Sequence, residues 1–163
     1  MISNIVILII LILLNAFFAA SEIAFISLND ARIEVQAKDG NKRAKLINKM
    51  LKDPSQFLAT IQIGITLAGF LSSAFAVDTF ADKVVPLFYT AIPSISIGTW
   101  RNIVIMLITV ILSYFTLVFG ELVPKRIAMK YTEKVAYISV YIIKFISKLT
   151  SPFVKLLTIS TNA

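Results

Sequence analysis

Three long segments with almost no charged residues constrain what this chain can fold into. They cover residues 1–28, 54–77 and 102–124, and their only charged side chains are Glu22 and Glu121. A helix of about 20 apolar residues crosses the hydrocarbon core of a bilayer. The chain is 58% hydrophobic and 15% charged, whereas soluble domains are about 45–50% apolar and about 25% charged. We therefore expect an all-α membrane protein with three transmembrane helices.

The first two segments each allow a second interpretation. Residues 1–28 resemble a cleaved signal peptide in their apolar character, but they lack a positively charged start. Their apolar stretch also exceeds the usual ~7–15 residues of such a peptide. Residues 54–77 contain Gly64 and Gly69, at which a helix can break. This second segment therefore either spans the membrane as one helix or re-enters it as a broken one.

The connecting segments are polar. Residues 30–53 contain the turn signal Gly40-Asn41 between two helical patterns, which predicts a helical hairpin at the membrane surface. Residues 78–101 contain prolines and a glycine, and we expect them to form an extramembrane connection. In residues 125–157, lysines and tyrosines recur at i+3/i+4 spacing opposite an apolar face. That pattern predicts a juxtamembrane amphipathic helix lying in the interface.

A fourth transmembrane span over residues 125–157 is the alternative. It would place Lys144 and Lys148 within the bilayer, at a cost of about 3 kcal/mol for each near the centre, so we favour the interfacial helix.

The distribution of Lys and Arg predicts the topology. Seven lie in residues 30–53, two in residues 78–101 and seven after residue 124. Basic residues near spans remain on the cytoplasmic side. We therefore expect a multi-pass protein of the cell membrane with its N-terminus outside and its C-terminus in the cytoplasm. Three spans make a thin bundle, and a homodimer would supply the missing walls.

The residue types that are missing exclude several kinds of chemistry. The chain has no Cys and no His, which rules out disulfides, thiolates and imidazole ligands. A bound metal must then be held by oxygen atoms, which favours hard cations such as Mg²⁺, Ca²⁺ or Na⁺. No Lys lies within a spanning segment to activate a nucleophile, so we expect no enzymatic activity.

The net charge of +7 has two interpretations, nucleic acid and membrane lipid. The basic residues flank the apolar segments, so the anionic leaflet is the simpler partner, and we expect no nucleic-acid binding.

Polar or small residues recur at helical spacing inside the apolar segments. They are Asn15, Ala19, Ser21 and Glu22 in the first segment, Gln62, Thr66, Gly69, Ser72 and Ser73 in the second, and Thr109, Ser113, Thr116, Gly120 and Glu121 in the third. One polar face per helix is what a shared polar interior requires. Close helix packing is the alternative, because small residues let helices approach and hydroxyls bond across the contact.

Glu121 is the strongest functional candidate among these residues. Pro124 has no N–H to donate to the carbonyl of Gly120, four residues earlier, so that carbonyl is freed from the helix. A carboxylate, a free carbonyl and hydroxyls are the ligands of hard cations. A plain proline kink is the alternative at this position. For Glu22, pairing with a basic residue at the cytoplasmic rim is an equal alternative to a functional role.

Three short runs carry a resemblance to a known family. They are AASEIA at 19–24, GFLSS at 69–73 and FGELVPK at 119–125. Together they resemble the transmembrane domain of the CorC/CNNM magnesium-transport family. The resemblance extends over nearly all 163 residues, and the GELVPK run is its most specific part.

This resemblance implies a dehydrated Mg²⁺ bound within the membrane of a homodimer. Carried onto this sequence, the ligands would be Ser21, one or both of Ser72 and Ser73, the Gly120 carbonyl and Glu121, with Glu22, Asn15, Thr66, Gly69 and Thr116 as secondary candidates and Pro124 as the kink. The family is viewed as exporting Mg²⁺, with Na⁺ proposed as the coupling ion.

The chain departs from the family pattern at its C-terminal end. Family members normally continue into cytosolic CBS modules, which bind ATP, and a further C-terminal domain. This chain ends at Ala163, and we expect an isolated transmembrane domain that ATP affects only through the missing modules. The alternative function is a dimerising membrane anchor that supports cytosolic regulatory domains without transporting ions.

Overall fold

The computed structural model describes residues 2–161, all of whose regular elements are helices. In chain order these are α1 (Ile2–Ile26), α2 (Asp30–Lys38), α3 (Lys42–Leu51), α4 (Pro54–Ala91), α5 (Ile97–Leu117), the π-helical η1 (Val118–Leu122), α6 (Val123–Lys130) and α7 (Thr132–Thr161). Three helical stretches are long and apolar enough to cross a membrane, namely Ile2–Ile26, Pro54–Ala91 and Ile97–Lys130. The predicted all-α class with three membrane-compatible helices is confirmed.

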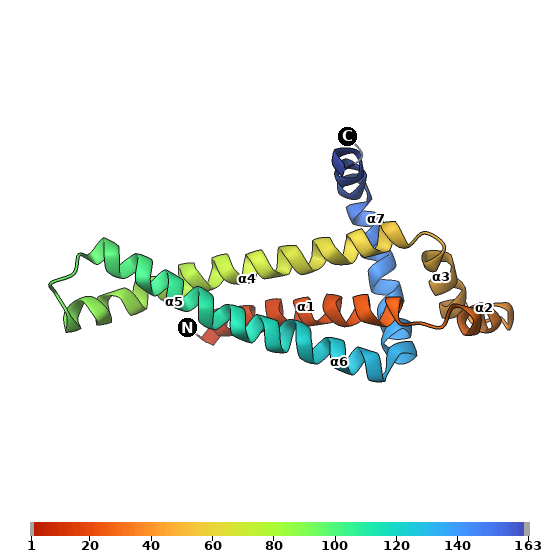
Figure 1. Ribbon diagram of the computed structural model, residues 1–163, viewed down its shortest axis with the longest axis horizontal. Helices are drawn as coiled ribbons and strands as arrows, with labels where there is room; N and C mark the ends of the chain where they lie inside the picture. The colour runs from red at the N-terminus through yellow and green to blue at the C-terminus, as the bar shows by residue number, and fades with distance from the viewer. Residues whose placement is uncertain (1, 162–163) are drawn as a thin grey trace.

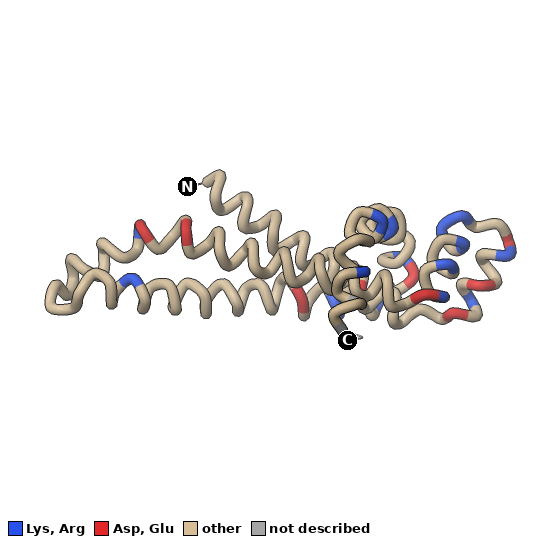
Figure 2. The backbone as a smooth tube through the Cα atoms, turned by 90° about the horizontal axis from the view of Figure 1, so that it is seen from above, with Lys and Arg blue, Asp and Glu red and all other residues tan. Residues whose placement is uncertain are grey.

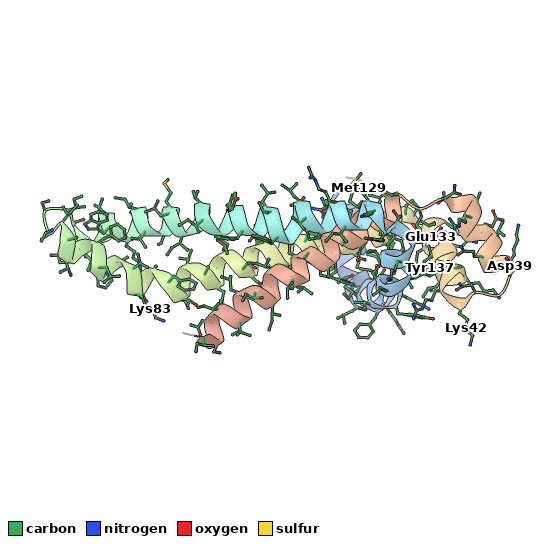
Figure 3. The ribbon with its side chains drawn as sticks, turned by 90° about the horizontal axis from the view of Figure 1, so that it is seen from below. Asp39, Lys42, Lys83, Met129, Glu133 and Tyr137 are labelled. Atoms are coloured by element: carbon green, nitrogen blue, oxygen red, sulfur yellow. The ribbon has the colours of Figure 1, made fainter. Side chains whose placement is uncertain are left out.

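The three long helices lie side by side (Figure 1). Helices α4 and α5 form a long antiparallel hairpin, and α1 packs against α4, η1 and α6. Gly64 makes the approach of α1 to α4 close, because a Cβ at this position would lie 2.5 Å from the ring of Phe18. Figure 3 shows α1 diverging from the hairpin towards its N-terminus.

Helix α4 decides between the two interpretations of the second segment and corrects the predicted connection after it. It is continuous through Gly64 and Gly69, and it runs on to Ala91, so the connection predicted over 78–101 is reduced to residues 92–96. At about 1.5 Å per residue, its 38 residues are far longer than a bilayer core of about 30 Å. One end of the α4–α5 hairpin therefore extends beyond the membrane.

Packing explains why the helices continue past the proline signals. Val85, Trp100 and Val104 form a small buried apolar cluster between α4 and α5. The Trp100 indole donates a hydrogen bond to the Ile92 carbonyl at 3.2 Å. These contacts stabilise a helical tip in which Pro86 sits within α4.

The predicted amphipathic helix over residues 125–157 is two helices. The backbone leaves helical geometry at Tyr131 (φ −124°, ψ 42°), so α6 extends the third span while α7 crosses the end of the bundle (Figure 1). The cause is tertiary packing. Ala136, Val140 and Ile143 of α7 are fully buried in the same apolar core as Phe25 of α1 and Phe57 of α4.

The helical pair α2–α3 packs on α7 through the shared apolar core and through polar contacts. Gly40 takes a positive φ of 97° at the turn between them. Arg32 pairs with Glu133 at 2.9 Å, and the Tyr137 hydroxyl donates to the Gln36 side chain. Burial, and then the nearby Glu133, raise the pKa of Tyr137, so its phenol stays protonated as a donor. Most charged residues gather at this end of the molecule, which we call the basic end (Figure 2).

Candidate functional site

A polar groove lies between α4 and the α5–η1 stretch, within the membrane-compatible helices. It encloses about 510 Å³. Its lining consists of Ile65, Thr66, Gly69, Phe70, Ser73, Leu112, Ser113, Thr116, Leu117 and Glu121. The groove therefore brings together six residues that the sequence analysis selected on two different helices: Thr66, Gly69, Ser73, Ser113, Thr116 and Glu121.

The backbone beside this groove is a π-helical turn. Val118–Leu122 adopt π geometry, and the Val123 N–H bonds to the Val118 carbonyl five residues earlier. Pro124 supplies the local cause, since it cannot donate the next helical hydrogen bond. Such π turns inside α-helices often occur at functional sites. The predicted kink at Pro124 is thus a change of helical register that begins before the proline.

The Gly120 carbonyl has a partner, contrary to the expectation that it would be free. It accepts a hydrogen bond from the Asn15 amide of α1 at 3.1 Å. Gly120 allows this approach, because a Cβ there would lie 3.0 Å from the Asn15 Nδ2 and 3.5 Å from the Thr116 Cγ2. The Gly120 carbonyl thus joins η1 to α1 through a side-chain hydrogen bond.

Three buried side-chain oxygens near this helix contact have no hydrogen-bond partner within the described residues. They are the Oδ1 of Asn15, the Oγ of Ser72 and the Oγ1 of Thr116. Asn15 and Ser72 are only 3% and 1% exposed. Buried polar atoms are usually paired, so orphaned acceptors call for a water or an ion. All three residues were candidates from the sequence, and one comes from each of the three long helices.

The five primary ligand candidates fall into two groups. Ser73 and Glu121 line the groove, whereas Ser21, Ser72 and Gly120 are buried and do not belong to its lining. The Ser21 hydroxyl donates to the carbonyl of Phe17 in its own helix at 2.7 Å. Of the five, the structure thus places Ser73 and Glu121 together in the groove.

Lys125 forms ion pairs with both carboxylates of the apolar segments, Glu22 and Glu121. The sequence analysis did not predict the pair with Glu121. The Lys125 Nζ lies 2.8 Å from the Glu121 Oε1 and 3.1 Å from the Glu22 Oε2. The side chains are only 26%, 34% and 23% exposed for Lys125, Glu121 and Glu22. The i,i+4 spacing of Glu121 and Lys125 was the available signal. For Glu22, the alternative of a basic partner is the one observed.

The charge at the site follows from this trio. Two carboxylates and one ammonium leave a net charge of −1 beside the groove, and Glu121 still faces the open volume. Within the described residues there is no cluster of three or more Asp or Glu that could hold a metal ion. A cation here would need hydroxyl and carbonyl oxygens in addition to one carboxylate.

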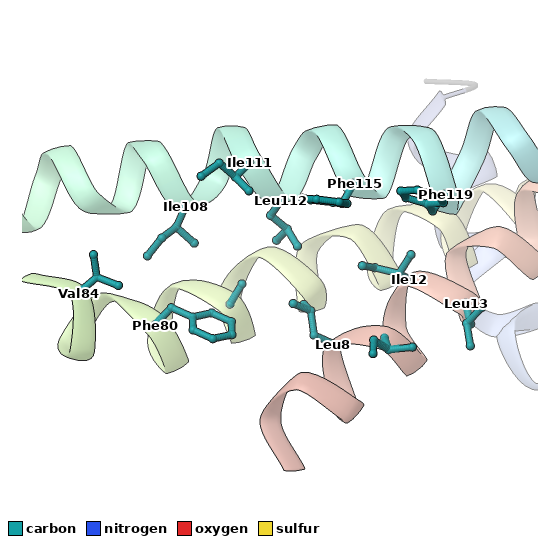
Figure 4. Close-up of a pocket in the computed structure, with 12 residues that line it drawn as sticks. Leu8, Ile12, Leu13, Phe80, Val84, Ile108, Ile111, Leu112, Phe115 and Phe119 are labelled. Atoms are coloured by element: carbon teal, nitrogen blue, oxygen red, sulfur yellow. The ribbon is translucent and has the colours of Figure 1, made fainter. Parts of the chain in front are cut away.

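A second cavity differs from the polar groove because it has no polar lining residue. It encloses about 560 Å³ between α1, α4 and α5, and apolar side chains alone line it (Figure 4). It offers no ligand to an ion, and lipid chains are its natural surroundings in a bilayer.

Comparisons with known proteins match almost the whole chain. The family model "Cyclin M transmembrane N-terminal domain" (CNNM) matches residues 6–163. A UPF0053 protein of Synechocystis is 40% identical over 94% of this chain and 34% of its own length. The UPF0053 inner membrane protein YfjD of Escherichia coli is 32% identical over 91% of this chain and 31% of its own.

A more distant relative carries a functional name. The "Polyamine export protein" of Haemophilus influenzae is 25% identical over 88% of this chain and 33% of its own length. The chain spans about a third of the length of each of these relatives. The family match covers far more than half of the chain and confirms the resemblance found in the three sequence runs. The chain therefore belongs to the CNNM family, of which it is the transmembrane N-terminal domain.

Proposed function

We propose that this domain carries Mg²⁺ through the membrane by way of the polar groove, as the transport unit of a Mg²⁺ exporter. The family and its relatives support a membrane transport-related role, and the identity of the ion is our proposal. The observation that carries it is the groove itself. A carboxylate and hydroxyls from two helices meet there, beside buried oxygens that lack partners. We assign the domain transport and no catalysis.

The ligand chemistry suits a hard divalent cation. Mg²⁺ prefers six oxygen ligands and gives up water reluctantly. Glu121 would supply charge, while Ser73, Thr66 and Thr116 would replace part of the hydration shell. Ser72 and the Gly120 carbonyl, which are next in sequence to Ser73 and Glu121, would join only after a small rearrangement that releases Asn15.

Lys125 acts as the resident counter-charge in this scheme. When Mg²⁺ binds, Glu121 coordinates the ion in place of its ion pair with Lys125, and Lys125 keeps its ion pair with Glu22. The local charge changes from −1 to +1 when the ion enters. Na⁺ uses the same oxygen ligands at half the charge, and we propose that it is the ion exchanged for Mg²⁺.

Ion flux in liposomes tests this proposal. The reconstituted chain should move Mg²⁺ into or out of vesicles that hold a Mg²⁺-sensitive dye, with the Mg²⁺ and Na⁺ gradients varied independently. Glu121→Gln removes the charge at constant shape and should abolish the flux. Glu34→Gln, in the exposed α2, is the matched control and should leave the flux unchanged. Flux retained by Glu121→Gln would refute the proposal.

An organic ammonium is the second candidate substrate. The Lys125 ammonium already lies between Glu22 and Glu121 at hydrogen-bonding distances, so the site accepts that chemical group. The name of the Haemophilus relative, a polyamine export protein, points to the same chemical class. Spermidine supplied in place of Mg²⁺ in the liposome assay separates the two. Spermidine flux without Mg²⁺ flux would replace our first assignment.

A second copy of the chain is the partner we propose for the groove. Thr66 and Ser113 of its lining are exposed, and polar groups that face lipid are costly. A homodimer that covers this face would remove that cost. Cross-linking through Ser113→Cys in proteoliposomes should trap the dimer, and the same change at the lipid-exposed Phe145 should not.

A dimerising membrane anchor without transport remains the competing function. Thermal unfolding of the detergent-solubilised protein separates it from a transporter, because a ligand that binds only the folded state raises stability with concentration. We expect millimolar Mg²⁺ to raise the unfolding temperature of the natural chain and not that of Glu121→Gln. We place the basic end in the cytoplasm of a cell-membrane protein, which labelling of single cysteines at either end would test.

A further inference from the structure

A basic cavity lies at the basic end, away from the polar groove. It encloses about 440 Å³ between α3, the start of α4 and α7. Its lining consists of Leu46, Lys49, Met50, Asp53, Gln56, Phe57, Lys144, Ser147, Lys148 and Ser151. None of these residues lines the groove that holds Glu121, so the cavity has no part in the function proposed above.

The charges in this cavity are not balanced by the protein. Lys49, Lys144 and Lys148 make no ion pair with any residue of the described range 2–161. Asp53 is the one acid in the lining, so three lysines and one aspartate leave a charge of +2. Lysine ammonium groups with hydroxyl and amide donors beside them are a common set for phosphate recognition.

The cavity opens where headgroups would lie. Helix α4 begins its apolar course at Pro54, next to Asp53. Helix α7 crosses the bundle at this level (Figure 1), and its Phe145 and Leu149 are 69% and 70% exposed. A helix with exposed apolar residues and lysines lies in the membrane interface, with its apolar side among acyl chains.

The cavity has a polar wall and an apolar wall, which match the polar headgroup and the apolar chains of a lipid. Its lysines, Gln56, Ser147 and Ser151 supply the polar part, while Leu46, Met50 and Phe57 supply an apolar wall. A neighbouring cavity of about 450 Å³ shares Asp53, Gln56 and Ser151 and adds Lys155. The polar strip therefore continues along α7 from Lys144 to Lys155.

We propose that this cavity binds the phosphate headgroup of an anionic phospholipid and thereby joins α3, α4 and α7 at the membrane surface. Lys49, Lys144 and Lys148 contact the phosphate, and the apolar wall receives the first part of the acyl chains. Lipid is the occupant, and not free phosphate, because the apolar wall and the exposed apolar side of α7 adjoin the lysines.

Thermal unfolding of the detergent-solubilised chain, with added lipid and without Mg²⁺, tests this proposal. Phosphatidylglycerol should raise the unfolding temperature in a saturable way, and phosphatidylcholine should not. In Lys49→Gln/Lys144→Gln/Lys148→Gln the affinity for phosphatidylglycerol should fall about fivefold for each lysine removed, the effect expected of one basic residue near an anionic surface. Circular dichroism verifies folding, and the single variant Lys144→Gln serves if the triple variant misfolds.

A matched control separates a built site from general attraction. Lys42→Gln/Lys45→Gln/Lys134→Gln removes the same charge from exposed lysines of α3 and α7 that do not line the cavity, and it should keep the lipid effect. An equal loss in both triple variants would overturn the proposal in favour of a diffuse basic surface. An equal shift with glycerol 3-phosphate would overturn it in favour of a free-anion site, and no shift in the natural chain would exclude a site altogether.

Discussion

Lys125 and the three lysines of the basic cavity differ in how their charge is balanced. Lys125 is 26% exposed and contacts two carboxylates from two different helices. Lys49, Lys144 and Lys148 are exposed and have no acidic partner within the described residues 2–161. The first lysine belongs to a membrane-compatible helix, and the others lie at the end of the bundle.

This difference follows from the surroundings of each charge. Between apolar helices no water is available, so the protein must supply the counter-charge from its own side chains. At the surface, water and lipid headgroups supply it instead. The charge of Lys125 is therefore neutralised within the fold, whereas the unpaired lysines of the basic cavity are the place where we propose that lipid binds.

Removing Lys125 should lower the free energy of unfolding more than any other substitution proposed below. A small effect would contradict the view that the fold depends on the pairing of this lysine. Lys125→Met leaves Glu22 and Glu121 facing each other without a cation. Breaking a buried ion pair costs about 3–5 kcal/mol, and the partial exposure of these groups reduces our expectation to about 2–3 kcal/mol of unfolding free energy. Unfolding in detergent measures it. The control is Lys130→Met, on the exposed side of the same helix α6.

A compensating variant sharpens this prediction. Lys125→Met/Glu22→Gln/Glu121→Gln carries no charge in the trio and should recover most of the lost stability, because no uncompensated carboxylate remains. If the single and triple variants are equally unstable, then Lys125 stabilises the fold by packing alone, and charge balance is not the reason for its position.

Asn15→Leu should have a smaller effect. It removes the donor to the Gly120 carbonyl and leaves that buried oxygen unpaired. Losing a partner in this way costs about 1–3 kcal/mol in water-soluble proteins, but polar contacts between membrane helices average about 0.6 kcal/mol. The orphaned Asn15 Oδ1 disappears at the same time, so we expect a loss of about 1 kcal/mol in detergent unfolding. Leu14→Asn makes the opposite exchange on the exposed side of α1, where an amide has no partner to bond, and it serves as the control.

Much of this architecture is visible in the sequence because it depends on composition and spacing. The charge-free segments predict the three long helices, since crossing a bilayer leaves few other arrangements. The spacing i, i+4, i+7 and i+11 predicts one shared face on each of two helices: Gln62, Thr66, Gly69 and Ser73 on the first, and Thr109, Ser113, Thr116 and Gly120, with Glu121 alongside, on the second. The groove that joins them lies where those faces meet.

What the sequence does not reveal depends on contacts between distant segments. The pairing of Lys125 with Glu22 joins helices α6 and α1, and the bond from Asn15 to Gly120 joins α1 and η1. The break at Tyr131 has no proline or glycine to announce it, and burial of Ala136 and Val140 in the shared core accounts for it. Pro86 is a misleading local signal, because the contact of Val85 with Trp100 keeps α4 helical beyond it.

Arg32→Gln should change the free energy of unfolding least. It tests the comparison with an ion pair that is exposed to water. Arg32 pairs with Glu133 at 2.9 Å, as closely as Lys125 pairs with Glu121, but its side chain is 66% exposed. Exposed pairs contribute about 0–1 kcal/mol, and salt screens them. We expect Arg32→Gln to lower the free energy of unfolding by less than about 1 kcal/mol, and high salt to remove the difference from the natural chain. The loss caused by Lys125→Met should persist at the same salt concentration, since the trio is largely shielded from water. Equal costs for the two variants, or equal salt sensitivity, would mean that depth in the membrane does not decide which charges this protein must pair.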